Sequence, residues 1–233
     1  TERVRKVLFL IPSVDSGGIE TYLLRFLKIH KLEIDPFVLI RNTRKGNLLE
    51  EYKKLSIPMF FLPLGYINPY RCLKYFIFFR RNSFDTICDF NGNFAGLTMW
   101  LAYFAGIEKR ITSYRQGSNH FNSSFLKKSY NFLVNRLVFN YSTTIIFNSR
   151  SALNVFFPNS VPGTDSRFKV IYNGINTKEL LNKVSSSEIR HDLGIDLNAF
   201  VIGHVGRYDK TKNHTTILKV AEKYSLFVIE DSA

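Results

Sequence analysis

Cysteine is scarce in this sequence, and no pattern of metal ligands occurs. Cys72 and Cys88 are the two cysteines in 233 residues, and neither belongs to a Cys-x-x-Cys pair or a Cys/His cluster. Two cysteines are too few for a disulfide framework, and structural metal sites need several closely spaced ligands. The sequence therefore favours a reducing, cytoplasmic setting and predicts no metal site.

Long apolar runs and a secretory leader are also missing. No run of about 18 apolar residues occurs, which excludes an obvious membrane-spanning helix. The chain opens at Thr1 without the charged segment and apolar segment of a signal peptide. We therefore expect neither secretion nor a membrane span, although a leader trimmed from before Thr1 stays an open alternative.

Acidic residues are few relative to basic ones. The chain has 32 Lys and Arg against 19 Asp and Glu, a formal net charge of +13. Such a field attracts polyanions and anionic membrane surfaces. Because the basic residues are scattered and no nucleic-acid-binding motif occurs, we expect no nucleic-acid partner. An anionic membrane surface stays open as a partner.

Apolar strands and amphipathic helices alternate through most of the chain. Val7–Ile11 (VLFLI) is apolar throughout, which is typical of a parallel strand covered on both faces. A glycine-containing turn follows, and then Ile19–His30 with apolar residues at helical spacing. Further strands are expected at 37–40, 59–62, 86–90, 110–114, 144–147 and 169–172, and further helices at 48–55, 70–81, 95–105, 125–140 and 150–157. This alternation predicts an α/β fold with a Rossmann-like doubly wound parallel sheet.

The alternation then breaks and restarts. Pro158–Arg167 is rich in Pro, Gly and Ser, and Asn173–Asn176 (NGIN) has the composition of a turn. A polar, weakly helical segment precedes a fresh apolar strand at 200–205 and a helix at 214–224. The expected division is an N-terminal domain, a linker and an incomplete second Rossmann-like unit, at residues 1–176, 177–198 and 199–233. The incomplete unit is expected to expose apolar surface and to favour self-association.

Two glycine-containing segments follow predicted strands. Gly17 and Gly18 precede the first helix, whose N-terminal N–H groups can bind a phosphate; a tight turn without a ligand is the alternative. Arg207 and Lys212 (GRYDKTK) follow the strand of the second unit, where their cations suit a diphosphate; a solvated basic loop is the alternative. The dinucleotide fingerprint and the Walker pattern do not occur.

Other polar residues also follow predicted strands, where ligands of open α/β sheets bind. These candidates for lining a cleft are Asp89, Asn91, Arg115, Asn119 and Asn173, of which Asn173 also suits the interdomain turn. His204, inside an apolar strand, is interpreted as a core histidine. Asp85 and Asp89 are not fixed across a sugar as the carboxylates of a glycosidase would be, and no Gly-x-Ser-x-Gly motif of a hydrolase occurs.

Four stretches resemble the family 4 glycosyltransferases of the GT-B fold. They are VLFLIPSVDSGGIETYLLRFL, TTIIFNSRSALNVF, FKVIYNGIN and VIGHVGRYDKTKNHTTILKVAEK, which start at residues 7, 143, 168 and 201. They cover nearly the whole chain in the order and at the separations found in that family. The order is specific, whereas each stretch by itself is not.

The resemblance implies a retaining transfer of a sugar from a UDP- or GDP-sugar to a glycan or lipid-linked acceptor. Such enzymes build bacterial capsules, exopolysaccharides and O-antigens, with the acceptor on the N-terminal domain and usually no metal or other cofactor. By position, Gly17 and Gly18 would face the donor phosphates, while Arg207 and Lys212 would neutralise the departing diphosphate. His120 would lie near the donor sugar, although a surface-loop histidine is the interpretation we favour.

The chain also departs from this family. The ExxxxxxxE signature of its donor domain is expected later in that domain, beyond Ala233. Glu222 and Glu230 have the same spacing, but they straddle an expected helix end and the next strand, so we interpret this match as chance. We therefore expect the chain by itself to lack most of the donor pocket and to be inactive. One alternative is a non-catalytic acceptor-binding module that needs a partner. The other is a general nucleotide binder, which the missing dinucleotide fingerprint disfavours.

Two aromatic segments bear on membrane contact. Tyr75–Arg81 (YFIFFRR) either lies on an anionic membrane surface or is a core helix with a charged end. Ala95–Ala105 (AGLTMWLAYFA) is expected to be buried against the sheet. With the lipid-linked acceptors of the resembled family, the first alternative would place the protein on the inner face of the cytoplasmic membrane.

Overall fold

The computed structural model describes residues 3–44, 46–65, 68–115, 125–158, 165–174, 186–204, 212–224 and 226. By its internal contacts the chain forms two compact units, residues 1–174 and 175–233. The first unit contains all the strands found in the described part of the chain.

The first unit is built on a seven-stranded sheet with the order β3-β2-β1-β4-β5-β6-β7. Every neighbouring pair of strands is parallel. The strands are β1 (Lys6–Ile11), β2 (Asp35–Ile40), β3 (Met59–Phe61), β4 (Thr86–Asp89), β5 (Lys109–Tyr114), β6 (Thr144–Phe147) and β7 (Phe168–Val170). This architecture confirms the predicted Rossmann-like doubly wound parallel sheet.

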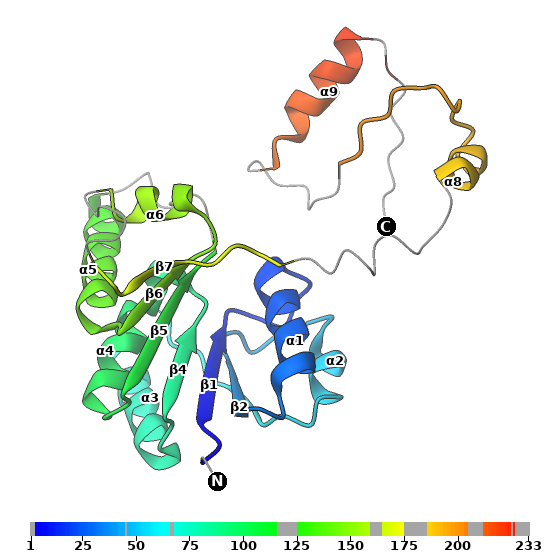
Figure 1. Ribbon diagram of the computed structural model, residues 1–233. Coiled ribbons are helices and arrows are strands. Elements are labelled where there is room, and N and C mark those ends of the chain that lie inside the picture. The colour runs from blue at the N-terminus through cyan, green and yellow to red at the C-terminus, as the bar shows by residue number, and fades with distance from the viewer. Residues whose placement is uncertain are drawn as a thin grey trace. The chain divides into compact units, whose positions relative to one another are not determined.

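Helices lie on both faces of this sheet (Figure 1). On one face are α1 (Gly18–His30) and α2 (Leu49–Lys53), beside β1, β2 and β3. On the other face are α3 (Pro69–Asn82), the short 3-10 helix η1 (Gly92–Ala95), α4 (Gly96–Phe104), α5 (Phe125–Tyr141) and α6 (Arg150–Phe156). The second unit contains α8 (Ser186–Asp192) and α9 (His214–Lys223).

The sheet separates two hydrophobic cores, and β1 contributes to both. Leu8 and Leu10 pack into the core under α3 and α4, whereas Phe9 and Ile11 pack into the core under α1 and α2. Successive side chains of a strand point to opposite faces, so a strand buried on both sides is apolar at every position. This is the physical reason for the unbroken run VLFLI.

The helix that begins after Asn68 is a core helix with a charged end. The Asn68 side chain accepts a hydrogen bond from the Arg71 backbone N–H (3.1 Å), and Pro69 opens the helix. Tyr75 and Phe79 are 0% and 1% exposed beneath the sheet. This is the second of the two interpretations offered for the aromatic stretch. No helix in the described ranges is long and apolar enough to cross a membrane.

The helix α4 is buried as predicted over most of its length. Leu97, Met99 and Leu101 are buried, whereas Tyr103 and Phe104 at its end are half exposed. Gly96 opens the helix beside α5, where an added Cβ atom would lie 2.1 Å from the backbone oxygen of Val134. A glycine is therefore required at this contact between α4 and α5.

The second unit departs from the sequence prediction. The predicted strand at 200–205 is wrong for residues 200–204, which form no strand, because no neighbouring strand pairs with them among the described residues. His204 is exposed and lies edge-on against His214, 4.7 Å between ring centroids, so its assignment to a core is also wrong. Phe200 is 80% exposed, which agrees with the expected apolar surface.

Candidate functional site

The polar residues of interest lie at the carboxyl edge of the sheet, between β1 and β4. The chain runs from β1 outward to β2 and β3, and from β4 outward in the other direction to β7. Ligands of doubly wound sheets bind in the crevice at such a topological switch point. The loops after β1 and β4 are therefore the candidate site of the first unit.

The loop after β1 places a carboxylate at the start of α1. Gly17 is the N-cap of the helix, and Glu20 in its first turn is 6% exposed. A Cβ atom on Gly17 would lie 2.3 Å from Glu20 Oε2, while Ser13 Oγ donates to Glu20 Oε1 (3.2 Å). A negative charge is stabilised at a helix N-terminus.

This carboxylate bears on the predicted phosphate site at Gly17 and Gly18. Gly18 is open, with nothing within 4 Å of an added Cβ atom. The charge of Glu20 nevertheless opposes a second anion beside Gly17. Glu20 was not among the residues predicted from sequence, although a glutamate at the third helical position is a known sign of a helix start.

The end of β4 carries a buried ion pair. Asp89 is 0% exposed, and its Oδ2 accepts a hydrogen bond from Arg41 Nη2 at 2.5 Å. Arg41 directly follows β2, so the pair links the ends of β2 and β4 past β1. The same guanidinium donates to the Phe94 backbone oxygen (3.1 Å) and to the Thr98 hydroxyl. These contacts attach the edge of the sheet to η1 and α4.

The loop after β4 is held by the same aspartate. Asp89 Oδ1 accepts hydrogen bonds from the backbone N–H of Asn91 (2.9 Å) and from Asn91 Nδ2 (2.6 Å). Gly92 follows with φ +58°, a left-handed conformation suited to glycine. A Cβ atom on Gly92 would lie 3.3 Å from the Tyr114 ring. Asp89 and Asn91, both predicted, are thus brought together, with Asp89 below the surface and Asn91 half-buried.

A second cluster lies at the ends of β5, β6 and β7. The Arg115 guanidinium lies over the Tyr22 ring, 3.6 Å from its centroid, and hydrogen-bonds the Asn173 side-chain oxygen. Asn148 Nδ2 donates to the Arg115 backbone oxygen (3.4 Å). The structure therefore brings together the predicted residues Arg115 and Asn173, and the cation–π contact fixes the arginine beside α1.

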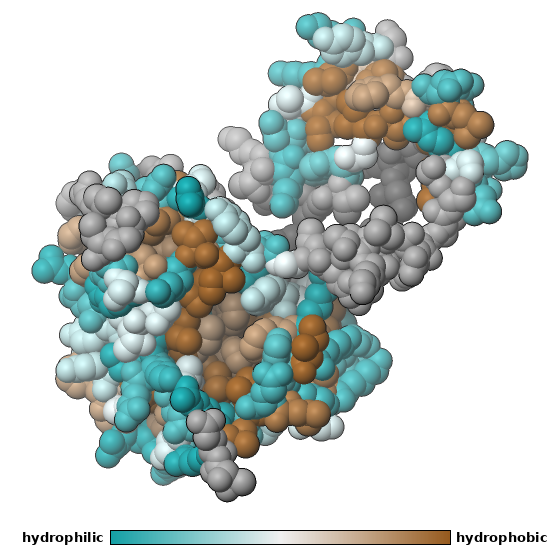
Figure 2. All heavy atoms as spheres, viewed as in Figure 1, coloured by the Kyte–Doolittle hydropathy of each residue, from teal (hydrophilic) through white to brown (hydrophobic). Residues whose placement is uncertain are grey.

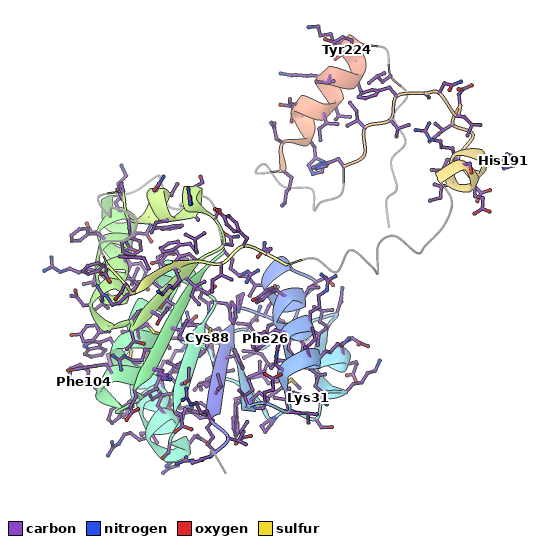
Figure 3. All side chains as sticks on the ribbon, viewed as in Figure 1. Phe26, Lys31, Cys88, Phe104, His191 and Tyr224 are labelled. Carbon is purple, nitrogen blue, oxygen red and sulfur yellow. The ribbon has the colours of Figure 1, made fainter. Side chains whose placement is uncertain are left out.

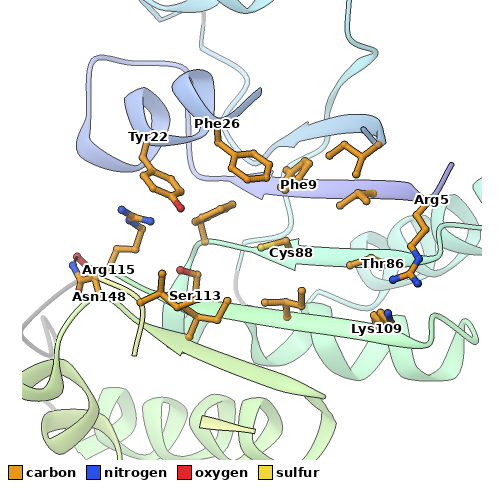
Figure 4. Close-up of a pocket in the computed structure, with 16 residues that line it drawn as sticks. Arg5, Phe9, Tyr22, Phe26, Thr86, Cys88, Lys109, Ser113, Arg115 and Asn148 are labelled. Carbon is orange, nitrogen blue, oxygen red and sulfur yellow. Dashed lines mark hydrogen bonds between the residues drawn. The ribbon is translucent and has the colours of Figure 1, made fainter. Parts of the chain in front are cut away.

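An apolar groove runs along the sheet on the α1 side, with a volume of about 470 Å³ (Figure 4). Phe9, Phe26 and Cys88 line its middle, Arg5 and Lys109 its amino end and Arg115 its carboxyl end. Right-handed crossovers put the helices after β4, β5 and β6 on the opposite face, so no described helix covers this part of the sheet. Figure 2 shows apolar residues gathered on this unit between hydrophilic margins.

Cys88 lies in this groove, close to Phe26 of α1 (Figure 3). Burial, and to a lesser extent the charge of Asp89, raise the pKa of the Cys88 thiol to about 12. Cys72 on α3 is half-buried. The two thiols are therefore expected to differ in reactivity, because the thiolate is the reacting form.

We expect a thiol reagent at pH 8 to modify Cys72 in the folded protein. Cys88 should react about a thousandfold more slowly than a free thiol, because its raised pKa lowers the fraction of thiolate. Mass spectrometry after timed alkylation measures both rates. In C72S the folded protein should stay unmodified, and urea should expose Cys88. Rapid labelling of Cys88 in the folded C72S protein would contradict its burial.

The remaining predicted site residues lie mostly outside the described ranges. Asn119, His120 and Arg207 belong to this group. Lys212 is exposed and directly precedes Asn213, the N-cap of α9, which has φ 54°. Within the ranges that the structure describes, no cluster of three or more His, Cys, Asp or Glu is arranged to hold a metal ion.

Two curated proteins resemble the chain in sequence. The capsular polysaccharide biosynthesis glycosyltransferase CapH of Staphylococcus aureus is 23% identical over 222 residues. The putative glycosyltransferase EpsF of Bacillus subtilis is 27% identical over 237 residues. Each alignment covers 93% of this chain but 57% and 58% of the relative, so the chain spans a little over half of their length. No protein-family model matches the sequence.

Solved structures show which fold this is. Anabaena HepE in complex with UDP superposes with a TM-score of 0.70 at 22% identity, covering 93% of this chain and 57% of HepE. HepE in complex with UDP-glucose gives a TM-score of 0.68 at 23% identity, covering 94% and 57%. The fold is that of GT-B glycosyltransferases. The predicted fold class is thereby confirmed over most of the chain.

Proposed function

We propose that the protein belongs to the machinery of bacterial surface polysaccharide synthesis, as a glycosyltransferase that moves a sugar from a nucleotide diphosphosugar to a glycan or lipid-linked acceptor. The similarity to CapH and EpsF carries this proposal, because it extends over 93% of the chain and both relatives are named as glycosyltransferases. The family 4 assignment, a retaining mechanism and transfer of a hexose are parts of the proposal that rest on the motifs.

The two units would divide the work. The crevice between β1 and β4 would take the acceptor, and Arg207 and Lys212 would bind the diphosphate of the donor without a metal. Fixed cations stabilise the charge that develops on a departing diphosphate, by several kcal/mol in a site without water. UDP-sugars are the first donors to test, because HepE, a protein of the same fold, binds UDP and UDP-glucose.

Two further points belong to this proposal. The domain division at 1–176, 177–198 and 199–233 makes the first part the acceptor side and the last the start of the donor side. Residues 1–233 alone would then lack most of the donor pocket and transfer no sugar. A cytoplasmic location, with peripheral contact to the inner membrane face, would bring lipid-linked acceptors within reach and would use the net charge of +13.

A non-catalytic role is the second candidate, because apolar residues stay exposed in the second unit. Leu197, Phe200 and Leu218 are 67%, 80% and 51% exposed. Exposed apolar surface of this kind marks a place that another polypeptide covers. In this alternative the chain binds an acceptor glycan and works with a separate partner.

Sugar transfer by the complete gene product tests the proposal. With UDP-glucose, UDP-galactose and UDP-N-acetylglucosamine as donors and extracted cell-envelope glycolipids as acceptors, we expect release of UDP. Lys212→Ala is expected to lower kcat/KM about 10-fold or more, the loss of one charge-assisted hydrogen bond. Lys219→Ala, on the exposed side of α9, is the matched control and should be unaffected.

The outcomes separate the two candidates. Transfer by the complete product, and none by residues 1–233, supports the enzyme. Binding of glycans without binding of any UDP- or GDP-sugar supports the acceptor-binding module. A complete gene product that binds neither a glycan nor a nucleotide sugar would contradict both candidate functions.

A further inference from the structure

The Asp89 carboxylate has both oxygens engaged within the protein. Oδ2 accepts from Arg41, and Oδ1 accepts from the backbone N–H and the side-chain nitrogen of Asn91. Asp89 is fully buried, so no substrate reaches it. Its contacts instead hold Asn91, two residues further along the loop after β4, in place.

These contacts fix which way the Asn91 amide points. A carboxylate beside a guanidinium only accepts hydrogen bonds, so the nitrogen of the amide must face Asp89 Oδ1. The amide oxygen of Asn91 therefore points away from Asp89. Within the ranges that the structure describes, no hydrogen bond to this oxygen is formed, and Asn91 is half-buried.

The backbone around Asn91 is equally constrained. The N–H of Phe90 donates to the Leu10 oxygen (3.0 Å), which attaches the loop to β1. Gly92 then turns through a left-handed conformation and lies against the Tyr114 ring. An oriented amide oxygen on a fixed loop is a preorganised acceptor, and it lies at the switch point where ligands of this fold class bind.

An amide oxygen selects its ligand by hydrogen-bond type. It accepts from a hydroxyl group, and it repels a phosphate oxygen, which also accepts. We propose that Asn91 is a specificity-determining residue that accepts a hydrogen bond from one hydroxyl of a neutral sugar, with Asp89 and Arg41 as positioning residues. This inference rests on the proposed function and names the ligand class of the crevice.

Sugar analogues test this assignment directly. The probes are methyl glycosides of glucose, galactose and N-acetylglucosamine, each with single hydroxyl groups replaced by hydrogen or by fluorine. Fluorine cannot donate a hydrogen bond, so both replacements at the contacted position should weaken binding about 10-fold. Saturation-transfer NMR on the 233-residue chain measures the affinities.

Variants identify the protein partner of that hydroxyl. In Asn91→Ala the natural glycoside should bind about 10-fold more weakly, and the deoxy and fluoro analogues should lose nothing further. Asn82→Ala is the matched control, because Asn82 is a half-buried asparagine that donates to the Phe78 oxygen (2.8 Å) at the opposite end of the sheet. It should behave like the native protein.

Asp89→Asn separates positioning from mere stability. An asparagine at 89 offers a donor as well as an acceptor, so the Asn91 amide is free to reverse and present its nitrogen. This variant should therefore narrow the difference in affinity between the natural and fluoro glycosides, a change that loss of stability alone would not produce.

Each result has a distinct meaning. Sugar binding that shows no coupling between any hydroxyl and Asn91 would overturn the inference and leave the proposed function standing. Equal losses in Asn91→Ala and Asn82→Ala would overturn the inference as well. Failure to bind any glycoside or UDP-sugar would overturn both.

Discussion

Replacing Asp89 by alanine is expected to lower the free energy of unfolding by about 3–5 kcal/mol, as removal of one partner from a buried ion pair does. The Arg41 side chain is 14% exposed, and its Nε has no hydrogen-bond partner among the residues that the structure describes. Without Asp89, a buried guanidinium would lose its counter-charge. Urea unfolding followed by circular dichroism measures the change.

Two controls make this result specific. Glu51→Ala removes two exposed ion pairs, to Lys28 and Lys54, and should leave stability almost unchanged because surface pairs contribute little. The double variant Arg41→Met/Asp89→Leu removes both charges and should recover much of the loss. A single Asp89→Ala variant as stable as the native protein would contradict the burial of this pair.

Gly96→Ala is expected to destabilise the protein by about 3 kcal/mol, the upper part of the usual range for overpacking. The added methyl group would lie 2.1 Å from the Val134 backbone oxygen, and backbone of α5 cannot rotate out of the way as a side chain can. The expected loss outweighs the gain of about 1 kcal/mol that alanine brings over glycine in a helix.

Gly18→Ala is the matched control for this prediction. Gly18 is the first residue of α1, and nothing lies within 4 Å of an added Cβ atom there. The substitution should leave the unfolding midpoint unchanged or raise it slightly. If both glycine variants were equally stable in urea titrations, the close approach of α4 and α5 would be disproved.

The order of strands and helices could be predicted from sequence because the periodicities are strong. The apolar run at Val7–Ile11 became β1, and the helical pattern at Ile19–His30 became α1. The prediction of a strand at 200–205 was wrong because strand pairing is not a local property. The apolar residues of this segment match a buried strand, but a strand forms only where a neighbour completes its hydrogen bonds, and no strand in the described part of the chain pairs with residues 200–204.

The position of the candidate site could be predicted from sequence, but the partners of its side chains could not. Asp89 and Asn91 were found because polar residues after a strand of a parallel sheet lie at its carboxyl edge. Arg41 was missed, because it is 48 residues from Asp89 and nothing in the local pattern after β2 separates it from a solvated arginine. Glu20 was overlooked at a position where the sequence alone offered a capping signal.

The sequence by itself determined the alternation of strand and helix, the fold class and the edge of the sheet where polar residues gather. These follow from local periodicity, which is a property of neighbouring residues. Only the tertiary structure decided that Asp89 is buried with Arg41, that Asn91 is oriented by Asp89, and that Glu20 lies against Gly17. Burial and hydrogen-bond partners depend on which distant strands become neighbours, and the strand order supplies that information.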